Sequence, residues 1–169
     1  MKSKIVSNLE TARLYFCGIS ESDAVYIVRW RSDSNVFRYF RDPHQLTMQE
    51  HLRWYNSCYL LDENRFDWIC IEKSSKKKIG VFSLRLLSDG TRAEVSYLLD
   101  PLARHKGYAT EAVSFLMKVA FDSYMVNQVV AEIHKDNQPS IDLVERLGFR
   151  CIEAKGNFKL FAANSILSS

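Results

Sequence analysis

Several features that would narrow the function of this chain are missing from its sequence. The net charge is only +3, which is too small to indicate nucleic-acid binding by itself. No apolar run approaches the roughly 20 residues that span a bilayer. The cysteines form no CxxC pair, and no histidine lies near them at metal-ligand spacing. We expect no metal site, no membrane or nucleic-acid partner, and reduced, mostly packed thiols at Cys17, Cys58, Cys70 and Cys151.

Length and composition indicate one globular domain. The chain has 169 residues, of which 47% are apolar and 25% charged, as in an ordinary soluble protein. That length suits a single compact core and is short for two domains. The N-terminal segment MKSKIVSNLETAR lacks the apolar core of a signal peptide. We therefore expect one domain over residues 1–169 and a cytoplasmic location.

Patterning in the first part of the chain predicts two helices and several strands. The run ARLYFCGI is typical of a strand, and SESDAVYIVRWRSD of a helix capped by Ser20. A TxxE capping box at Thr47 and Glu50 predicts the start of a second helix. Residues 65–99 then contain three β-rich runs separated by KSSKKK and SDGT. Asp-Gly is a strong turn signal, so three antiparallel strands are predicted, with the lysine run as a solvated hairpin tip.

The second part predicts a long helix and a closing hairpin. From Gly107 to Tyr124, apolar residues recur at helical spacing. QVVAEIH then predicts a buried strand, NQPSIDLVERLGF a short helix closed by Gly148, and RCIEAKGNFKLFAA a hairpin. The expected fold class is α+β (α/β), with helices flanking a central, mostly antiparallel sheet.

The segment LLDPLARHKGYATEAV places basic residues at the mouth of the long helix. Arg104, His105 and Lys106 directly precede Gly107. A helix start leaves backbone N–H groups unpaired and carries partial positive charge, and a glycine lets phosphate oxygens approach them. Arg104 and Lys106 could add charge-assisted contacts or could simply be solvated. The pattern predicts a diphosphate site.

These same residues resemble a known signature. Arg104 to Ala109 is similar to the [Q/R]-x-x-G-x-[G/A] motif of the GNAT superfamily of N-acetyltransferases. VSYLLDP and HKDNQPSIDLVERLGF also resemble segments of that family, in the expected order, so the resemblance covers roughly residues 78–150. It implies a GNAT fold whose sheet is splayed near the cofactor, and acetyl-CoA as the cosubstrate.

The resemblance also implies which residues hold acetyl-CoA. Backbone groups of Leu98 and Leu99 would face the pantetheine and the thioester. Asn137 would contact the pantetheine arm, although it equally suits a helix N-cap. The pyrophosphate would lie on the loop and first helical turn, formed by Arg104, His105, Lys106, Gly107, Tyr108, Ala109 and Thr110.

Acetyl transfer to an amine needs a base to give a neutral amine, and a proton for the departing thiolate. By its position relative to Asn137, Glu132 resembles the glutamate that acts as this base through water in several family members. His134, two residues on, shares its strand face and is an alternative. Glu94, on the neighbouring strand, is another.

The proton donor is where this chain departs from the family. Many relatives carry a tyrosine seven residues after the asparagine, and here that position is Val144. Ser140 is the motif residue left to reach the sulfur, although a capping or packing role would also explain it. Tyr97 and Tyr108 are weaker candidates, since such aromatics are more often core.

The acceptor amine is expected to lie against the first two helices. The segment RWRSDSNVFRYFRDPHQLTMQEHLRWY more loosely resembles acetyltransferases of nucleotide-linked amino sugars, such as those of the pseudaminic acid pathway. Aromatic rings could stack on a sugar or base and arginines could hold a diphosphate, or the rings could seal a helix pair while the arginines are solvated. The candidate acceptor residues are Trp30, Arg31, Arg38, Arg41, Trp54 and Tyr55.

The expected function is thus acetyl-CoA-dependent N-acetylation of a small-molecule amine. A protein N-terminal acetyltransferase of the ribosomal-protein-serine type is the alternative, because its N-x-x-S…LGF segment is also similar. Such an enzyme needs an open groove for an extended peptide. A non-catalytic acetyl-CoA-binding module is a third reading, and a homodimer is left open.

Overall fold

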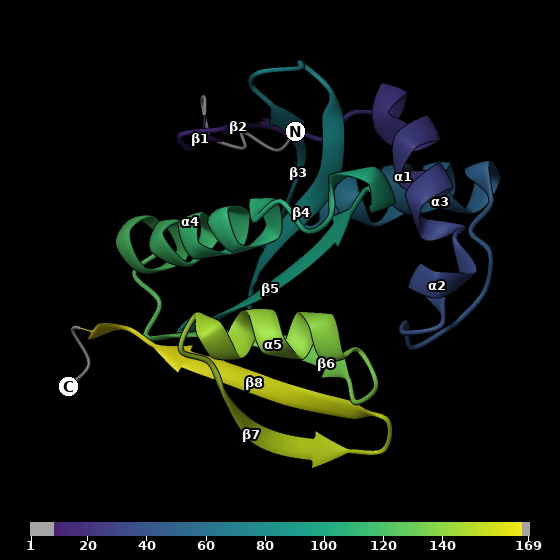
Figure 1. The fold of residues 1–169 in the computed structure, drawn as a ribbon. Coiled ribbons are helices and arrows are strands. Elements are labelled where there is room, and N and C mark those ends of the chain that lie inside the picture. Colours follow the sequence, from purple (N-terminus) through teal and green to yellow (C-terminus); the bar gives the residue numbers. More distant parts are fainter. Residues whose placement is uncertain (1–8, 167–169) are drawn as a thin grey trace.

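A single twisted sheet organises the protein in the computed structural model, which describes residues 9–166 (Figure 1). The strand order is β1-β2-β3-β4-β5-β6-β8-β7. Neighbouring strands are antiparallel except β5 and β6, which are parallel. The strands are β1 (Leu9–Glu10), β2 (Leu14–Gly18), β3 (Arg65–Glu72), β4 (Lys78–Leu86), β5 (Arg92–Leu99), β6 (Gln128–His134), β7 (Arg150–Lys155) and β8 (Phe158–Asn164).

Helices cover both faces of the sheet. Alternation along a strand sends neighbouring side chains to opposite faces: Cys70 and Leu99 pack with α4 and α5, whereas Ile69 and Leu98 pack with α1, α2 and the turn η2 that follows α3. None of the helices described is long and apolar enough to cross a membrane. The helices and helical turns are η1 (Glu21–Asp23), α1 (Ala24–Arg31), α2 (Ser34–Phe37), α3 (Met48–Ser57), η2 (Tyr59–Leu61), η3 (Pro101–Ala103), α4 (Tyr108–Ser123) and α5 (Gln138–Arg146).

The predicted fold class and the main elements are confirmed. The capping box at Thr47 starts α3, with the Thr47 side chain accepting from the Glu50 N–H. Ser20 caps its helix as expected, but the first turn is the 3₁₀ turn η1. The short helix α2 was missed. It forms because the Asp33 side chain accepts from the Asn35 N–H at 2.8 Å and so caps a segment with little periodicity.

The expectation that the cysteines are mostly packed is wrong. All four thiols are free, but only Cys70 is buried, and its burial raises its pKa to about 12. Cys17, Cys58 and Cys151 are exposed. For Cys17 the reason is strand alternation, because Leu14 and Phe16 of β2 take the inward positions.

The sheet opens between its two central parallel strands. β5 and β6 pair only from Arg92 to Glu94 and from Gln128 to Val130. Beyond these residues β5 stays paired with β4, and β6 with β8. The two strands therefore diverge, as the family resemblance implied, and leave a gap opposite the last residues of β5.

Candidate active site

The loop of residues 104–107, between η3 and α4, has an unusual backbone. His105 and Gly107 adopt positive φ angles of 61° and 80°, and Gly107 is the N-cap of α4. Within residues 9–166, the N–H groups of residues 105–107 donate to no backbone carbonyl. The first N–H groups of α4 also lack partners within the helix. Together these amides make a set of donors suited to phosphate oxygens.

A cavity of about 690 Å³ opens beside this loop. Arg146, from the last turn of α5, contributes a cation to its wall. Nothing in the sequence singles out Arg146, because an arginine in the last turn of a helix is normally explained by the helix dipole. The residues lining the cavity are His105, Gly107, Thr110, Glu111, Ser114, Arg146 and Leu147.

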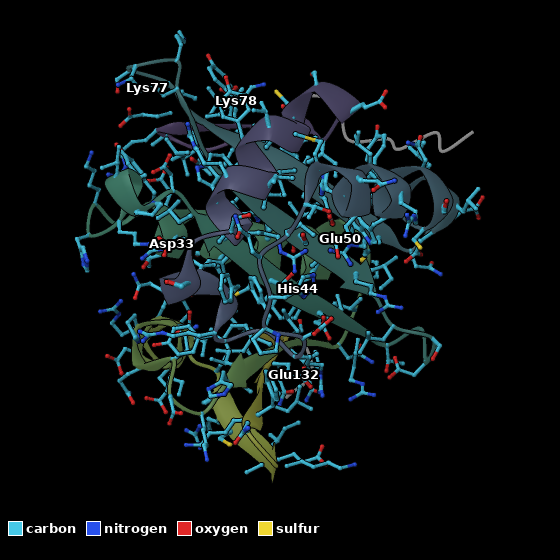
Figure 2. All side chains as sticks on the ribbon, turned by 90° about the vertical axis from the view of Figure 1, so that its right-hand side faces the viewer. Asp33, His44, Glu50, Lys77, Lys78 and Glu132 are labelled. Atoms are coloured by element: carbon cyan, nitrogen blue, oxygen red, sulfur yellow. The ribbon has the colours of Figure 1, made fainter. Side chains whose placement is uncertain are left out.

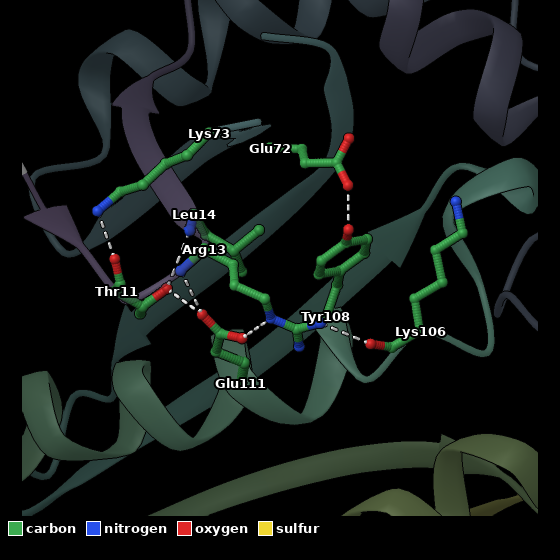
Figure 3. A network of polar contacts seen from close by, with 8 residues as sticks. All are labelled: Thr11, Arg13, Leu14, Glu72, Lys73, Lys106, Tyr108 and Glu111. Carbon is green, nitrogen blue, oxygen red and sulfur yellow. Dashed lines mark hydrogen bonds and ion pairs between the residues drawn. The ribbon is translucent and has the colours of Figure 1, made fainter. Parts of the chain in front are cut away.

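Arg13, in the turn between β1 and β2, fastens this loop to the sheet (Figure 3). Its Nε donates to Glu111 Oε2 at 2.6 Å and its Nη1 to the Lys106 carbonyl at 2.9 Å. Partial burial would raise the pKa of Glu111, but hydrogen bonds from Thr11 and Arg13 outweigh burial and lower it. Glu111 thus stays ionised, and the ion pair holds the loop against the first turn of α4.

Tyr108 also anchors the first turn of α4, with its ring directed toward Glu72 (Figure 3). Its ring is buried, and the Arg13 guanidinium carbon lies 4.5 Å from the ring centroid. Its hydroxyl donates to Glu72, and this hydrogen bond raises the pKa of Tyr108. Because the Tyr108 hydroxyl already donates its hydrogen bond to Glu72 and holds its proton more tightly, Tyr108 does not fit the role of proton donor to a thiolate. Its backbone amide stays a candidate coenzyme contact.

The pairing of β4 with β5 decides which backbone groups face the gap. The Asp100 N–H donates to the Ile79 carbonyl at 2.8 Å, which makes these residues a hydrogen-bonded pair at the end of the ladder. Such pairs alternate along an antiparallel ladder, so Leu98 also directs its N–H and C=O toward β4. Leu99 and Tyr97 direct theirs toward the gap. The expectation for the Leu98 backbone is therefore corrected: Leu99 and Tyr97 are the candidates.

Two carboxylates face the α1–α3 side of the sheet near the start of the gap. Glu94 lies opposite Val130, and Glu132 is two residues further along β6, on the same face. Glu94 is half-buried. Burial raises the pKa of Glu94, and the charge of Glu132 raises it further. A carboxylate with a raised pKa accepts a proton more readily near neutral pH, as a general base must.

Glu132 is held in an ion pair with Arg41, from the loop between α2 and α3. Arg41 Nε donates to Oε1 at 2.8 Å and Nη2 donates to Oε2, so both oxygens are engaged. Figure 2 shows Glu132 beside this loop, which also carries His44. In this arrangement Glu132 is less free than Glu94 to accept a proton from an amine.

His134 lies between two aromatic rings, with centroids 5.6 Å from Tyr39 and 5.3 Å from Phe158. Its Nδ1 accepts a hydrogen bond from the Asp136 N–H at 3.2 Å. A backbone N–H can only donate, so in the neutral ring the proton sits on Nε2. The one acceptor nitrogen of His134 is therefore already used, which disfavours His134 as the base.

A hydroxyl pair bridges the opposite side of the gap. Tyr97 of β5 donates its phenolic proton to Ser140 Oγ of α5 at 3.0 Å. The Ser140 proton is then available to another acceptor. Burial raises the pKa of Tyr97, so its hydroxyl stays protonated at neutral pH. Asn137 is the N-cap of α5, but its side chain makes no capping hydrogen bond to the residues described, which leaves its amide available to a ligand.

The predicted acceptor contact of Trp30 is wrong. Trp30 is only 2% exposed, and its Nε1 donates to Asp100 Oδ2 at 2.8 Å. The ring packs in the core between α1 and the sheet. It ties α1 to the end of β5 and cannot stack on a ligand.

The remaining acceptor candidates keep accessible surface. Arg31 is half-buried and packs 4.6 Å from the Phe40 ring centroid. Trp54 is also half-buried, and its ring lies 5.0 Å from the Arg65 guanidinium carbon. These side chains bring cations and aromatic faces to the α1–α3 side of the sheet.

Tyr55 and Arg38 are the other two candidate acceptor residues, and each contacts a tyrosine ring. Tyr55 stacks on the buried Tyr59 at 5.6 Å, and its partial burial raises its pKa. Arg38 is exposed and lies 4.7 Å from the centroid of Tyr39. The rings of Tyr55 and Tyr39 thus each already have a protein partner on one face.

Comparison with known proteins decides the family. The model of the acetyltransferase (GNAT) domain matches residues 13–150. The chain belongs to the GNAT family. One curated relative, an uncharacterized N-acetyltransferase p20 of Bacillus licheniformis, is 30% identical over 152 residues, which cover 86% of this chain and 83% of the relative. GNAT enzymes use acetyl-CoA, and the donors of residues 105–107 and the Arg146 cation fit its pyrophosphate.

Solved GNAT structures share the fold. FdhC, described as a nucleotide-linked sugar GNAT, superposes with a TM-score of 0.80 at 17% identity, covering 95% of this chain and 91% of its own. Spermidine N-acetyltransferase from Vibrio cholerae, in complex with CoA and spermine, gives 0.80 at 17% identity over 91% and 96% of the two chains. At this identity the likeness establishes the fold and leaves the acceptor open.

Proposed function

We propose that this GNAT enzyme acetylates the primary amine of a small molecule, with a nucleotide-linked amino sugar as the candidate acceptor. The observation that carries the proposal is Glu94, a half-buried carboxylate with a raised pKa at the start of the splayed gap. Arg31, Arg65 and Trp54 lie on the same side of the sheet and supply cations and an aromatic face. The nucleotide-linked sugar acetyltransferase FdhC has the same fold.

The chain's own groups would position the coenzyme. Acetyl-CoA supplies the acetyl group as a thioester. The amides of residues 105–107 and of the first turn of α4 would hold the pyrophosphate, with Arg146 as a further cation. The backbone groups of Tyr97 and Leu99 would bind the pantetheine and polarise the thioester carbonyl. The free side-chain amide of Asn137 would contact the pantetheine arm.

Glu94 would act as the general base, directly or through a water molecule. The amine nitrogen loses its proton to the Glu94 carboxylate, a C–N bond forms to the acetyl carbon, and the C–S bond breaks. Glu132 is the second candidate, because an acceptor that draws Arg41 away would free its oxygens. The two carboxylates interact, so their titrations belong to the pair.

Ser140 would return a proton to the departing thiolate. Its Oγ accepts from Tyr97, which orients the Ser140 proton away from the tyrosine. Tyr97 can then pass its own proton to Ser140 and regain one from solvent as coenzyme A leaves, while Glu94 releases the amine proton to solvent, so the hydroxyl pair acts as a short relay. This arrangement replaces the tyrosine that many relatives carry where this chain has Val144.

A protein N-terminal acetyltransferase is the alternative. An extended peptide needs an open groove, and here the Arg41–Glu132 ion pair joins the loop before α3 to β6 across the acceptor side. This bridge favours a compact acceptor. A non-catalytic acetyl-CoA-binding module is the minor alternative, and any saturable acetyl transfer would exclude it.

Release of free coenzyme A thiol across a panel of amines tests the proposal. The panel contains nucleotide-linked amino sugars, a peptide with an N-terminal serine, spermidine and an aminoglycoside. We expect the highest kcat/KM with an amino sugar nucleotide. Efficient acetylation of the peptide, with no activity on the sugars, would instead support the protein acetyltransferase.

Two further expectations stay predictions. Sedimentation velocity would test for a homodimer, and cell fractionation would test the cytoplasmic location.

A further inference from the structure

A buried histidine on the acceptor side has an unpaired ring nitrogen. His51 of α3 is 2% exposed, and among the residues described its Nε2 has no hydrogen-bond partner. Leaving a buried polar atom without a hydrogen-bond partner costs its desolvation free energy. Native proteins rarely keep such an atom without a reason, so His51 is a candidate ligand contact.

Arg31 of α1 is the neighbouring cation. Its guanidinium is half-buried against Phe40, and no carboxylate among residues 9–166 forms an ion pair with it. Burial lowers the pKa of Arg31, and the charge of Arg65 lowers it further, while Glu50 acts in the opposite direction. A partly desolvated cation next to a second cation favours an anion between or beside them.

The other charged groups around His51 do not supply that anion. Burial lowers the pKa of His51, the charge of Arg31 lowers it further, and Asp67 opposes both. Asp67 is itself paired with Arg65, whose Nε donates to Oδ1 at 2.9 Å. Glu50 is engaged in the capping box of α3 and with His44. Within residues 9–166, these groups therefore supply no anionic partner to Arg31 or to the His51 Nε2.

This cluster is continuous with the proposed base. The His51 and Trp54 ring centroids lie 5.5 Å apart, and the Arg65 guanidinium carbon lies 5.0 Å from the Trp54 centroid. Arg65 of β3 is in register with Arg85 of β4, which is in register with Glu94 of β5, so this cluster and Glu94 lie along one cross-strand row.

We propose that Arg31 and His51 form a subsite for one anionic group of the acceptor whose amine faces Glu94, either a phosphate group, as in a nucleotide-linked or phosphorylated sugar, or a carboxylate. The inference rests on the proposed function and adds to it that the acceptor is an anionic amine, whereas a polyamine would meet repulsion from Arg31 and Arg65.

Titration of His51 by NMR tests the subsite without relying on activity. The probes are inorganic phosphate and acetate, with coenzyme A present at saturation so that the pyrophosphate loop is filled. The chain has only four histidines, and a His51→Gln variant assigns the signal. An anion within hydrogen-bond distance should raise the pKa of His51 by about 1 unit or more. The probe that acts at lower concentration identifies the anionic group.

Matched variants separate the subsite from general charge effects. Arg31→Gln should abolish the shift, and Arg31→Lys should retain part of it if the glutamine variant folds poorly. Arg53→Gln removes the same charge from an exposed position on α3 and should leave the shift intact. A His51 titration that neither probe changes would overturn the subsite.

Activity measurements distinguish a failure of the Arg31–His51 subsite from a failure of the proposed function. Glucosamine 6-phosphate and glucosamine differ only in the phosphate, and we expect about a 10-fold or larger preference in kcat/KM for the former, equivalent to at least 1.4 kcal/mol. Acetylation of both amines at equal rates, with no change in the His51 titration, would contradict the subsite and leave the proposed acetyltransferase function supported. A raised His51 pKa without acetyl transfer to any amine would support anion binding at the subsite and contradict the proposed function.

Discussion

Glu94 illustrates how the surroundings of one side chain set its chemistry. Its sequence context, RAEVSYLL, is an ordinary strand, and the sequence supports Glu94 as a base only through its place on the strand next to that of Glu132. Only the fold places it half-buried and on the same face as Glu132. The ion pair that engages Glu132 is equally invisible in the sequence, because Arg41 and Glu132 are 91 positions apart.

Replacement of Glu94 by glutamine should separate activity from stability. We expect kcat to fall by about 10²- to 10⁴-fold, as is typical for loss of a general base, and the acid limb of the pH–rate profile to disappear. The comparison is Glu132→Gln, which removes the partner of Arg41. A larger loss of kcat in Glu132→Gln than in Glu94→Gln would assign the base to Glu132.

The same substitution should stabilise the fold at neutral pH. The folded-state pKa of Glu94 is raised above its ordinary value of 4.5, so folding disfavours the ionised form. This penalty is absent below about pH 4.5 and grows as the pH rises through the folded-state value. Urea unfolding of Glu94→Gln and the wild type should therefore diverge above pH 5, with the variant more stable.

The hydroxyl relay predicts a non-additive pair of variants. Ser140→Ala and Tyr97→Phe should each lower kcat with little change in the KM for acetyl-CoA, because neither hydroxyl is assigned to coenzyme binding. If the two hydroxyls act as one unit, the double variant should lose little more than Ser140→Ala alone. Fully additive losses in ln kcat would show that Tyr97 does not act through Ser140.

At the scale of elements, the loop before α4 depends on Gly107. A φ of +80° disfavours any L residue, and an added Cβ would lie 3.3 Å from Arg13 Nη2. Gly107→Ala should cost roughly 1–2 kcal/mol of stability and raise the KM for acetyl-CoA. Gly90→Ala is the matched control, because Gly90 has a φ of +70° in the turn between β4 and β5 with nothing within 4 Å.

The two variants should lose similar stability in thermal melts, but only Gly107→Ala should weaken coenzyme binding measured by calorimetry. Equal acetyl-CoA affinity in both would remove the loop from the binding site. We expect the added methyl group to act by displacing Arg13, which donates a hydrogen bond to the Lys106 carbonyl and so holds the loop in place.

Local chemistry explains which elements the sequence predicted well. Capping boxes, the Asp-Gly turn and the apolar spacing of α4 are short-range signals, so α3, α4 and the strands from β3 to β5 appear where expected. Trp30 failed as an acceptor residue because its neighbour Asp100 is 70 positions away. Leu98 was misassigned because the direction of a backbone amide depends on the register with β4, which no sequence motif records.

At the scale of the whole molecule, the predicted divergence of β5 from β6 and the predicted family are confirmed. The grouping of side chains on the acceptor side instead depends on contacts between distant parts of the sequence. Arg31, His51 and Arg65 come from three elements, α1, α3 and β3. Their grouping could not be predicted, since α3 follows a loop of no regular pattern. The proposed coenzyme contacts lie within residues 97–146, and most of them belong to one continuous sequence motif, from which Arg146 is absent.

The short pairing of β5 with β6 has a mechanical consequence. The sheet has two parts, β1–β5 and β6–β8, which are joined at one end by three residue pairs of β5 and β6. A coenzyme bound in the gap would contact both parts and hold them together. Amide hydrogen exchange in β6 and β8 should therefore slow when coenzyme A is added, more than in β3 and β4. Coenzyme at about 100 times its Kd adds roughly 2.7 kcal/mol to global stability, so the concentration of free coenzyme would set how strongly the two parts of the sheet are held together.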